Sequence, residues 1–346
     1  MNDNDKITLR RIDDMHCHFR LDWLLAQVLP FTARYAGRGI AMPNTRPRAI
    51  LTADDVVWYR DEIKWVLDRI PNRPSFEPLM TIEIRDTTTP KMIIDAKRAG
   101  AVAGKVYPLG TTTNSNEGLR DFLNESISAT FEMMQDLGML LLLHGELNQE
   151  RILVTKREEL FLPILLVLAE KFPDLKIVLE HVSTRVAVQT VKQLGKNVSA
   201  TLALPHLWLT LNDVIGDGIQ PHNACMPIPK DFDDRDALIE AATSGNPKFF
   251  FGSDTAPHPL GKKECAKGAC GVWSAPVVPQ ALAEIFEKAG HLDRLENFTS
   301  RFGAEFYGLP LNEGNITLVK KEWTVPDQYG SVVPFLAGTK LQWQLV

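Results

Sequence analysis

Short apolar runs alternate with amphipathic stretches along this chain, and that alternation limits the folds it can adopt. Several runs, such as MLLLL at 139–143, are apolar at every position, as strands buried on both faces are. Alternating strands and helices favour parallel pairing. The expected strands are residues 8–15, 38–42, 77–82, 103–107, 139–143, 176–181, 198–203 and 248–252.

The stretches between these runs have the period of helices that bury one face. Within residues 53–70, Val56, Ile63 and Leu67 lie along one stripe, and Thr52 is a candidate N-cap. Further helices are expected at 90–100, 117–138, 158–172, 184–195, 233–244 and 278–289.

This order of elements predicts an α/β protein built as a (β/α)8 TIM barrel, with an open doubly wound sheet as the alternative. No repeat, low-complexity segment or Pro/Gly-rich linker divides the chain, so we expect a single domain over 1–346. After residue 309 the pattern changes to short extended segments. Residues 310–346 are expected to form a small, strand-rich C-terminal extension packed on the barrel.

The composition restricts the partners of the protein. Of 346 residues, 45% are hydrophobic and 23% charged, and the net charge is -5. That balance gives no electrostatic reason to expect nucleic acid or an anionic membrane as a partner. The longest apolar stretches are too short to span a bilayer, and the N-terminus lacks the apolar core of a signal peptide. Four cysteines are too few for a disulfide framework, so we expect a cytoplasmic protein with reduced thiols.

Metal-binding side chains occur at the ends of the expected strands. The carboxyl ends of barrel strands converge at one mouth, where barrel enzymes have their active sites. Taken singly, a strand-end histidine or an H-x-H motif is usually structural, but five strand ends together indicate a shared site. The candidate ligands are His16, His18, Lys105, His144, His181 and Asp254.

The types of these residues indicate the metal. Imidazole and carboxylate without thiolate suit zinc, with iron, manganese or cobalt as alternatives. Four histidines and an aspartate exceed the needs of one open zinc site, which favours two ions. A protonated lysine would be repelled by two dications. We therefore expect Lys105 to be neutral or converted by carbon dioxide to a carbamate that bridges both ions.

Taken together, these motifs resemble the amidohydrolase superfamily and, within it, the bacterial-type (class II) dihydroorotases. The resemblance extends over nearly the whole chain, and the combination of motifs is far more specific than any one of them. The motifs are DMHCHFR at 14–20, AMPNT at 41–45, GKVYP and TTTNS within 104–115, LLLHGE at 141–146, LEHVST at 179–184, PHNACMPIPK at 221–230 and GSDTAPHPLGKKE at 252–264.

The resemblance implies two zinc ions bridged by N6-carboxylated Lys105, with His16, His18 and Asp254 on one ion and His144 and His181 on the other. It implies reversible cyclisation of N-carbamoyl-L-aspartate to (S)-dihydroorotate plus water, the third step of pyrimidine synthesis, in a homodimer. Asp254 would carry the proton between the attacking water and the ring nitrogen.

The resemblance also implies which residues contact the substrate. Arg20, Asn44 and His258 would bind its carboxylate, while Met226 and Cys270 would contact the ring. Residues 265–273 differ from the cysteine-rich sequence that is common in the family. Cys270 is assigned to the contact position by aligning the flanking residues without a gap. The remaining implied contacts are His18 and His144, and the threonines of a closing loop, Thr112 and Thr113.

Two other functions are compatible with parts of this pattern. A hydantoinase or dihydropyrimidinase shares the scaffold but acts on a neutral ring, so it lacks the carboxylate-binding residues. A catalytically silent relative kept as an assembly partner typically loses metal ligands, whereas all six candidates are present here.

Overall fold

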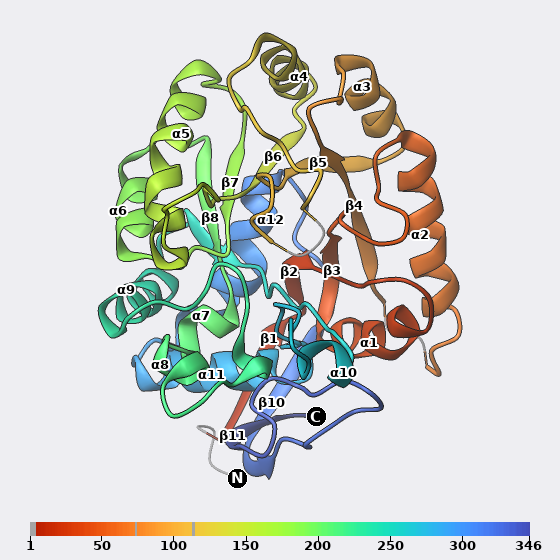
Figure 1. Ribbon diagram of the computed structural model, residues 1–346. Helices are drawn as coiled ribbons and strands as arrows, with labels where there is room; N and C mark the ends of the chain where they lie inside the picture. Colours follow the sequence, from red (N-terminus) through yellow and green to blue (C-terminus); the bar gives the residue numbers. More distant parts are fainter. Residues whose placement is uncertain (1–4, 73–74, 113–114) are drawn as a thin grey trace.

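Eight parallel strands follow one another around a single sheet, with helices outside it (Figure 1). The structure is a computed structural model that describes residues 5–72, 75–112 and 115–346. Cys17 bridges Thr255, just beyond the last strand, so the two edges of the sheet meet. The predicted barrel is confirmed and the open sheet is excluded. Its strands are β2 (Ile12–Cys17), β3 (Ala36–Ala41), β4 (Glu77–Ile84), β5 (Ala101–Val106), β6 (Leu140–His144), β7 (Ile177–Glu180), β8 (Val198–Leu202) and β9 (Phe249–Phe251).

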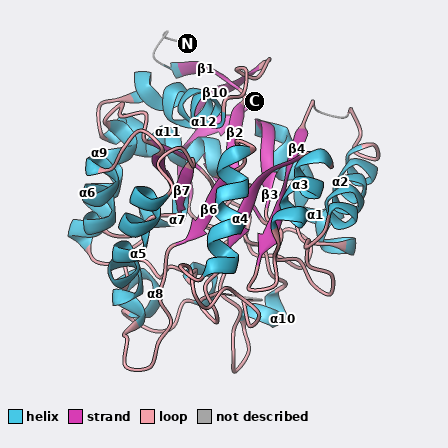
Figure 2. Ribbon diagram, turned by 90° about the horizontal axis from the view of Figure 1, so that it is seen from above, coloured by secondary structure: helices cyan, strands magenta, loops and turns pink. Residues whose placement is uncertain are grey.

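Helices cover the outer surface of the barrel, as the view from above shows (Figure 2). The predicted cap Thr52 forms a capping box, in which its hydroxyl and the Asp55 carboxylate each accept a hydrogen bond from the other's backbone nitrogen. Within the described ranges, none of the helices has the length and apolarity needed to cross a bilayer. The helices are α1 (Asp22–Tyr35), α2 (Ala53–Leu67), α3 (Pro90–Arg98), α4 (Glu125–Asp136), α5 (Arg157–Lys171), α6 (Arg185–Gln193), α7 (Leu204–Trp208), α8 (Asn212–Ile215), α9 (Phe232–Thr243), α10 (Leu260–Lys263), α11 (Val278–Lys288) and α12 (Phe302–Tyr307).

The short helices α7, α8, α10 and α12 were not expected, and two of the longer helices also differ from the prediction. Helix α1 was not expected, because Pro30 lies inside it and no side chain caps its first turn. The predicted helix 117–138 starts only at Glu125, where the Asn124 side chain accepts a hydrogen bond from Ile127 N at 3.0 Å. Residues ahead of that cap form an irregular segment at the barrel mouth.

The predicted first strand, 8–15, is wrong because it joins two strands of different sheets. Residues Lys6–Arg10 form β1, which pairs antiparallel with β10 (Asn315–Thr324), while β2 opens the barrel. Strand β11 (Lys340–Leu345) completes a three-stranded sheet in the order β1-β10-β11, close to both termini (Figure 1). The extension expected from the C-terminal residues therefore also contains an N-terminal strand.

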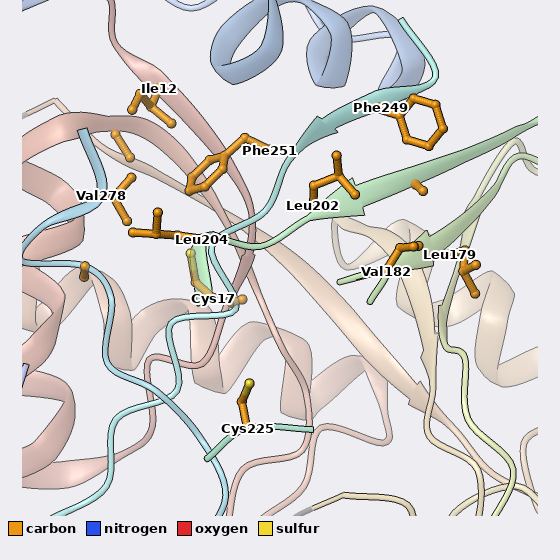
Figure 3. Close-up of a cluster of buried hydrophobic side chains, with 14 of the residues drawn as sticks. Ile12, Cys17, Leu179, Val182, Leu202, Leu204, Cys225, Phe249, Phe251 and Val278 are labelled. Carbon is orange, nitrogen blue, oxygen red and sulfur yellow. The ribbon is translucent and has the colours of Figure 1, made fainter. Parts of the chain in front are cut away.

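Strand alternation divides the buried side chains into two cores. Leu140, Leu142 and Phe250 belong to a core inside the barrel, whereas Leu141 and Leu143 belong to the larger core between strands and helices. Figure 3 shows part of this outer core, which also contains residues of the small sheet. Because side chains alternate, the inward-facing rows continue toward the mouth into polar residues. These are Lys105 after Ala103, His144 after Leu142 and Glu180 after Val178.

Candidate active site

A β-bulge brings the first two histidines to the mouth of the barrel. From Asp14 to Cys17 strand β2 advances by 17 − 14 = 3 residues, while the paired residues of β3, Gly39 to Ala41, advance by 41 − 39 = 2. The extra residue lets His16 turn toward the other candidate ligands while Cys17 packs in the outer core. Bulges commonly redirect side chains beside active sites in this way.

Two further candidate ligands have left-handed backbone conformations. His181 has φ 41° and Asp254 has φ 47°, values that non-glycine residues rarely adopt. Such conformations cost on the order of 1–3 kcal/mol each and persist where the surrounding structure enforces them, often at functional sites. Because of this kink, the consecutive residues Glu180 and His181 both bring ligand atoms close to His16, which regular strand alternation does not allow.

The oxygens nearest to Nδ1 of His16 and Nδ1 of His18 indicate where the protons of these imidazoles lie. Nδ1 of His18 is 2.9 Å from Oδ1 of Asn44, and Nδ1 of His16 is 3.1 Å from Oε1 of Glu180. Both oxygens accept hydrogen bonds, so each Nδ1 carries a hydrogen and each Nε2 has a lone pair. Burial, and for His16 the neighbouring Lys105, lowers the pKa of both imidazoles, which favours these neutral forms.

The two lone pairs point toward each other beside a carboxylate. Nε2 of His16 and Nε2 of His18 are 3.2 Å apart, and Oδ1 of Asp254 lies 3.4 Å and 3.3 Å from them. Three acceptor atoms therefore meet in a buried place without a proton to share. A cation bound between them converts this repulsion into coordination, so the donor set fits a metal site.

A second pair of imidazoles lies next to the first. Nε2 of His144 is 2.8 Å from Oε2 of Glu146, so it donates there and leaves its lone pair on Nδ1. That Nδ1 is 3.2 Å from Nε2 of His181. The His181 ring centroid is in turn 5.0 Å from that of His16. The four predicted histidine ligands thus form one continuous group.

Lys105 joins this group from the inward face of β5. Its side chain is completely buried, and Nζ donates to Oε2 of Glu180, the carboxylate that also faces His16. Burial lowers the pKa of Lys105 well below its usual value. All six predicted metal-site residues are therefore in the same polar network.

A cavity opens beside these ligands. Arg20 donates from Nε to the carbonyl oxygen of Pro257 at 2.9 Å, and its Nη2 is 3.1 Å from Nε2 of His258. Burial lowers the pKa of Arg20 to about 10, so its charge is retained at neutral pH. The lining residues are His18, Arg20, Asn44, Tyr107, Thr112, His144, His181, Met226, Asp254, Ala256, Cys270 and Gly271.

The predicted substrate contacts lie in or beside this cavity. His258 is the one that does not line it, but its Nε2 lies beside Arg20 and 3.1 Å from the carbonyl oxygen of Cys270. Of the two loop threonines, Thr112 lines the cavity, while Thr113 lies outside the described residues.

Three residues of the site were missed from the sequence. Glu180 and Glu146 contact proposed ligands, and the buried hydroxyl of Tyr107 has no hydrogen-bond partner within the described part of the chain. Strand alternation counted from the inward-facing Val178 could have identified Glu180. Glu146 and Tyr107 carry no comparable signal, because they follow their strands in irregular backbone.

Comparison with known proteins identifies the family. No family model matches the chain. The curated dihydroorotase of Shewanella frigidimarina is 43% identical, covering 98% of this chain and 99% of that protein. The crystal structure of a Campylobacter jejuni dihydroorotase has a TM-score of 0.90 at 39% identity, over 99% of this chain and 97% of that one. A Saccharomyces cerevisiae dihydroorotase in complex with 5-fluoroorotic acid also has a TM-score of 0.90, at 35% identity over 99% and 98% of the two chains. The chain therefore belongs to the dihydroorotase family of cyclic amidohydrolases.

Proposed function

We propose that this chain catalyses the reversible, zinc-dependent cyclisation of N-carbamoyl-L-aspartate to (S)-dihydroorotate and water, the third step of de novo pyrimidine synthesis. One observation carries the proposal beyond family membership: the charged Arg20 lines the same cavity as His18 and Asp254. A buried guanidinium beside a metal site can bind a substrate carboxylate and orient the amide bond toward the metal. The 5-fluoroorotic acid in the Saccharomyces complex is a ring compound of this acidic kind.

The proposed cofactors are two zinc ions bridged by N6-carboxylated Lys105. His16, His18 and Asp254 would hold one ion, and His144 and His181 the other. The lone pairs assigned to Nε2 of His16, Nε2 of His18 and Nδ1 of His144 support this division, and Nε2 of His181 lies 3.2 Å from that Nδ1. The lowered pKa of Lys105 favours the neutral amine, which is the form that reacts with carbon dioxide. When bound, such ions supply an activated water at neutral pH and polarise the substrate carbonyl.

The residues around the cavity would bind and orient the substrate. Arg20, with Asn44 and His258, would hold the carboxylate, and Met226 and Cys270 would contact the ring. His18 and His144 would touch the reacting end. Closure of the loop that contains Thr112 and Thr113 would exclude water and add hydrogen bonds to the developing oxyanion.

Asp254 is the proposed proton carrier. In the hydrolytic direction its carboxylate takes a proton from the attacking water and delivers it to the departing ring nitrogen, and cyclisation reverses this transfer. The position of its Oδ1, 3.4 Å and 3.3 Å from the Nε2 atoms of His16 and His18, supports this role because it places the carboxylate at the proposed metal site.

Substrate comparison and Arg20→Met test the proposal. The purified protein should turn over dihydroorotate but not dihydrouracil, which lacks the carboxylate. Arg20→Met should raise KM in both directions, because it removes the charge that binds the carboxylate. Equal turnover of the two rings would favour a hydantoinase, and a protein without bound metal would favour an assembly partner. We also propose a homodimer, for which sedimentation should give twice the mass of the chain.

A further inference from the structure

Glu180 faces two proposed metal ligands at once. It is the last residue of β7 and is only 1% exposed. Its Oε2 accepts a hydrogen bond from Nζ of Lys105, and its Oε1 is 3.1 Å from Nδ1 of His16. Neither Oε1 nor Nδ1 forms a hydrogen bond within the described residues. Two buried polar atoms without partners therefore face each other at a distance at which a hydrogen bond can form.

Glu180 could in principle bind an ion itself, because it lies with His16 and His181 in a group whose ligand atoms are within 4.8 Å of one another. The orientation of His16 argues against this. Its Nε2 faces His18 and Asp254, whereas its Nδ1 faces Glu180. A neutral imidazole has one lone pair, and a lone pair on Nε2 leaves the hydrogen on Nδ1. Glu180 therefore meets a hydrogen-bond donor.

We propose that Glu180 is a positioning residue that accepts hydrogen bonds from both His16 Nδ1 and Lys105 Nζ. This inference rests on the proposed zinc centre. A carboxylated lysine keeps one hydrogen on Nζ, so the bond to Glu180 remains available after the modification. A carboxylate behind a metal-binding imidazole fixes its tautomer and makes it a stronger ligand. Glu180 thereby couples a ligand of one ion to the residue that bridges both.

Burial makes the hydrogen bonds of Glu180 important for the stability of the site. An unpaired carboxylate is strongly disfavoured in the protein interior, and hydrogen-bonding partners offset that penalty. For Glu180 these partners are His16 and Lys105. If either side chain rotated away, the Glu180 carboxylate would lose a hydrogen-bond donor. The carboxylate therefore favours the orientation of both side chains before metal arrives.

The test compares Glu180→Gln with Glu158→Gln. Glu158 is also 1% exposed, but its Oε1 accepts from the backbone nitrogen of Ser183 at 2.8 Å. Burial raises the pKa of Glu158 to about 7, so a neutral glutamine is a mild replacement there. Zinc affinity is measured on the full-length protein by competition with a chromophoric chelator. Glu180→Gln should bind zinc about 10–100-fold more weakly, with the same number of ions at saturation. Glu158→Gln should match the wild type.

Unchanged affinity in Glu180→Gln would overturn the proposal, and so would the loss of an ion at saturating zinc, which would make Glu180 a ligand. If Glu180→Gln does not fold, Glu180→Asp keeps the charge but withdraws both oxygens, and it should also bind zinc more weakly. Wild-type affinity in that variant would again overturn the proposal. A wild-type protein that binds no zinc would instead refute the proposed function.

A second readout follows Lys105 directly. After exposure to ¹³C-labelled carbon dioxide, ¹³C NMR detects the carbamate carbon of a carboxylated lysine. Glu180→Gln should retain less of this signal than the wild type and Glu158→Gln, because the carbamate nitrogen loses its acceptor. An equal signal in all three proteins would contradict the proposed contact with Lys105. A wild type without the signal would refute the carboxylation itself.

Discussion

The two ends of the barrel contain buried polar groups with opposite arrangements. At the amino end, Arg38 donates to both carboxylate oxygens of Asp13, at 3.0 and 2.7 Å, and Asn312 donates to one of them. At the carboxyl end, nitrogens of His16 and His18 and an oxygen of Asp254 face one another without a donor. The first arrangement is complete within the chain, whereas the second needs a cation. The comparison separates polar groups that stabilise the fold from those that prepare a site.

The largest effect is expected at the carboxyl end, from Asp254→Asn. An amide cannot carry the proton between water and the ring nitrogen, so kcat should fall by about 10²–10⁴. In the metal-free protein the free energy of unfolding should not decrease, because the change removes one of the crowded acceptor charges. Steady-state kinetics and urea unfolding measure the two quantities. Near-normal turnover would remove Asp254 from the proton-carrying role.

At the amino end, Arg38→Met should have the opposite profile. It leaves the Asp13 carboxylate buried without its charged partner, which should lower the free energy of unfolding by about 3–5 kcal/mol. The kcat of the folded fraction should stay close to that of the wild type, since the pair lies at the far end of the strands. A large loss of kcat without loss of stability would mean that the two ends are not separate in function.

Leu142→Ala tests the apolar layer between the two ends. Leu142 is fully buried in the inner core, two residues before His144 on β6. The cavity it leaves should destabilise the protein by about 2–5 kcal/mol in urea unfolding. Leu166→Ala on α5, where the side chain is 46% exposed, is the matched control and should stay within about 0.5 kcal/mol of wild type. Equal losses of unfolding free energy in the two variants would show that the inner core contributes no more to stability than an exposed side chain does.

The sequence predicted the barrel because its main signal is local. Apolar runs such as residues 139–143 and the N-cap at Thr52 depend on neighbouring residues, and both were recognised. Helix α1 was missed because its own sequence, with Pro30 inside and no cap, argues against a helix that packing against the barrel stabilises. The strand boundary near residue 11 was missed because both flanking segments are extended.

The candidate site was predictable to the extent that it follows from strand ends. Six polar residues at or just after strands could be grouped because a closed sheet brings strand ends together. The left-handed conformation of His181 could not be anticipated, because its backbone nitrogen is held by the side chain of Thr201, twenty residues later on a neighbouring strand. Glu180 was overlooked because His181 was assigned to the inward face, and regular alternation then directs the preceding residue outward, although Glu180 continues the inward row of Val178.

The claim that the acceptors at the carboxyl end await cations is tested most directly by the metal content of the purified protein. Elemental mass spectrometry should find about two zinc ions per chain before chelation and none after it. Activity should disappear with the metal and return when zinc is restored. A protein that turns over dihydroorotate at full rate with no bound metal would contradict the claim.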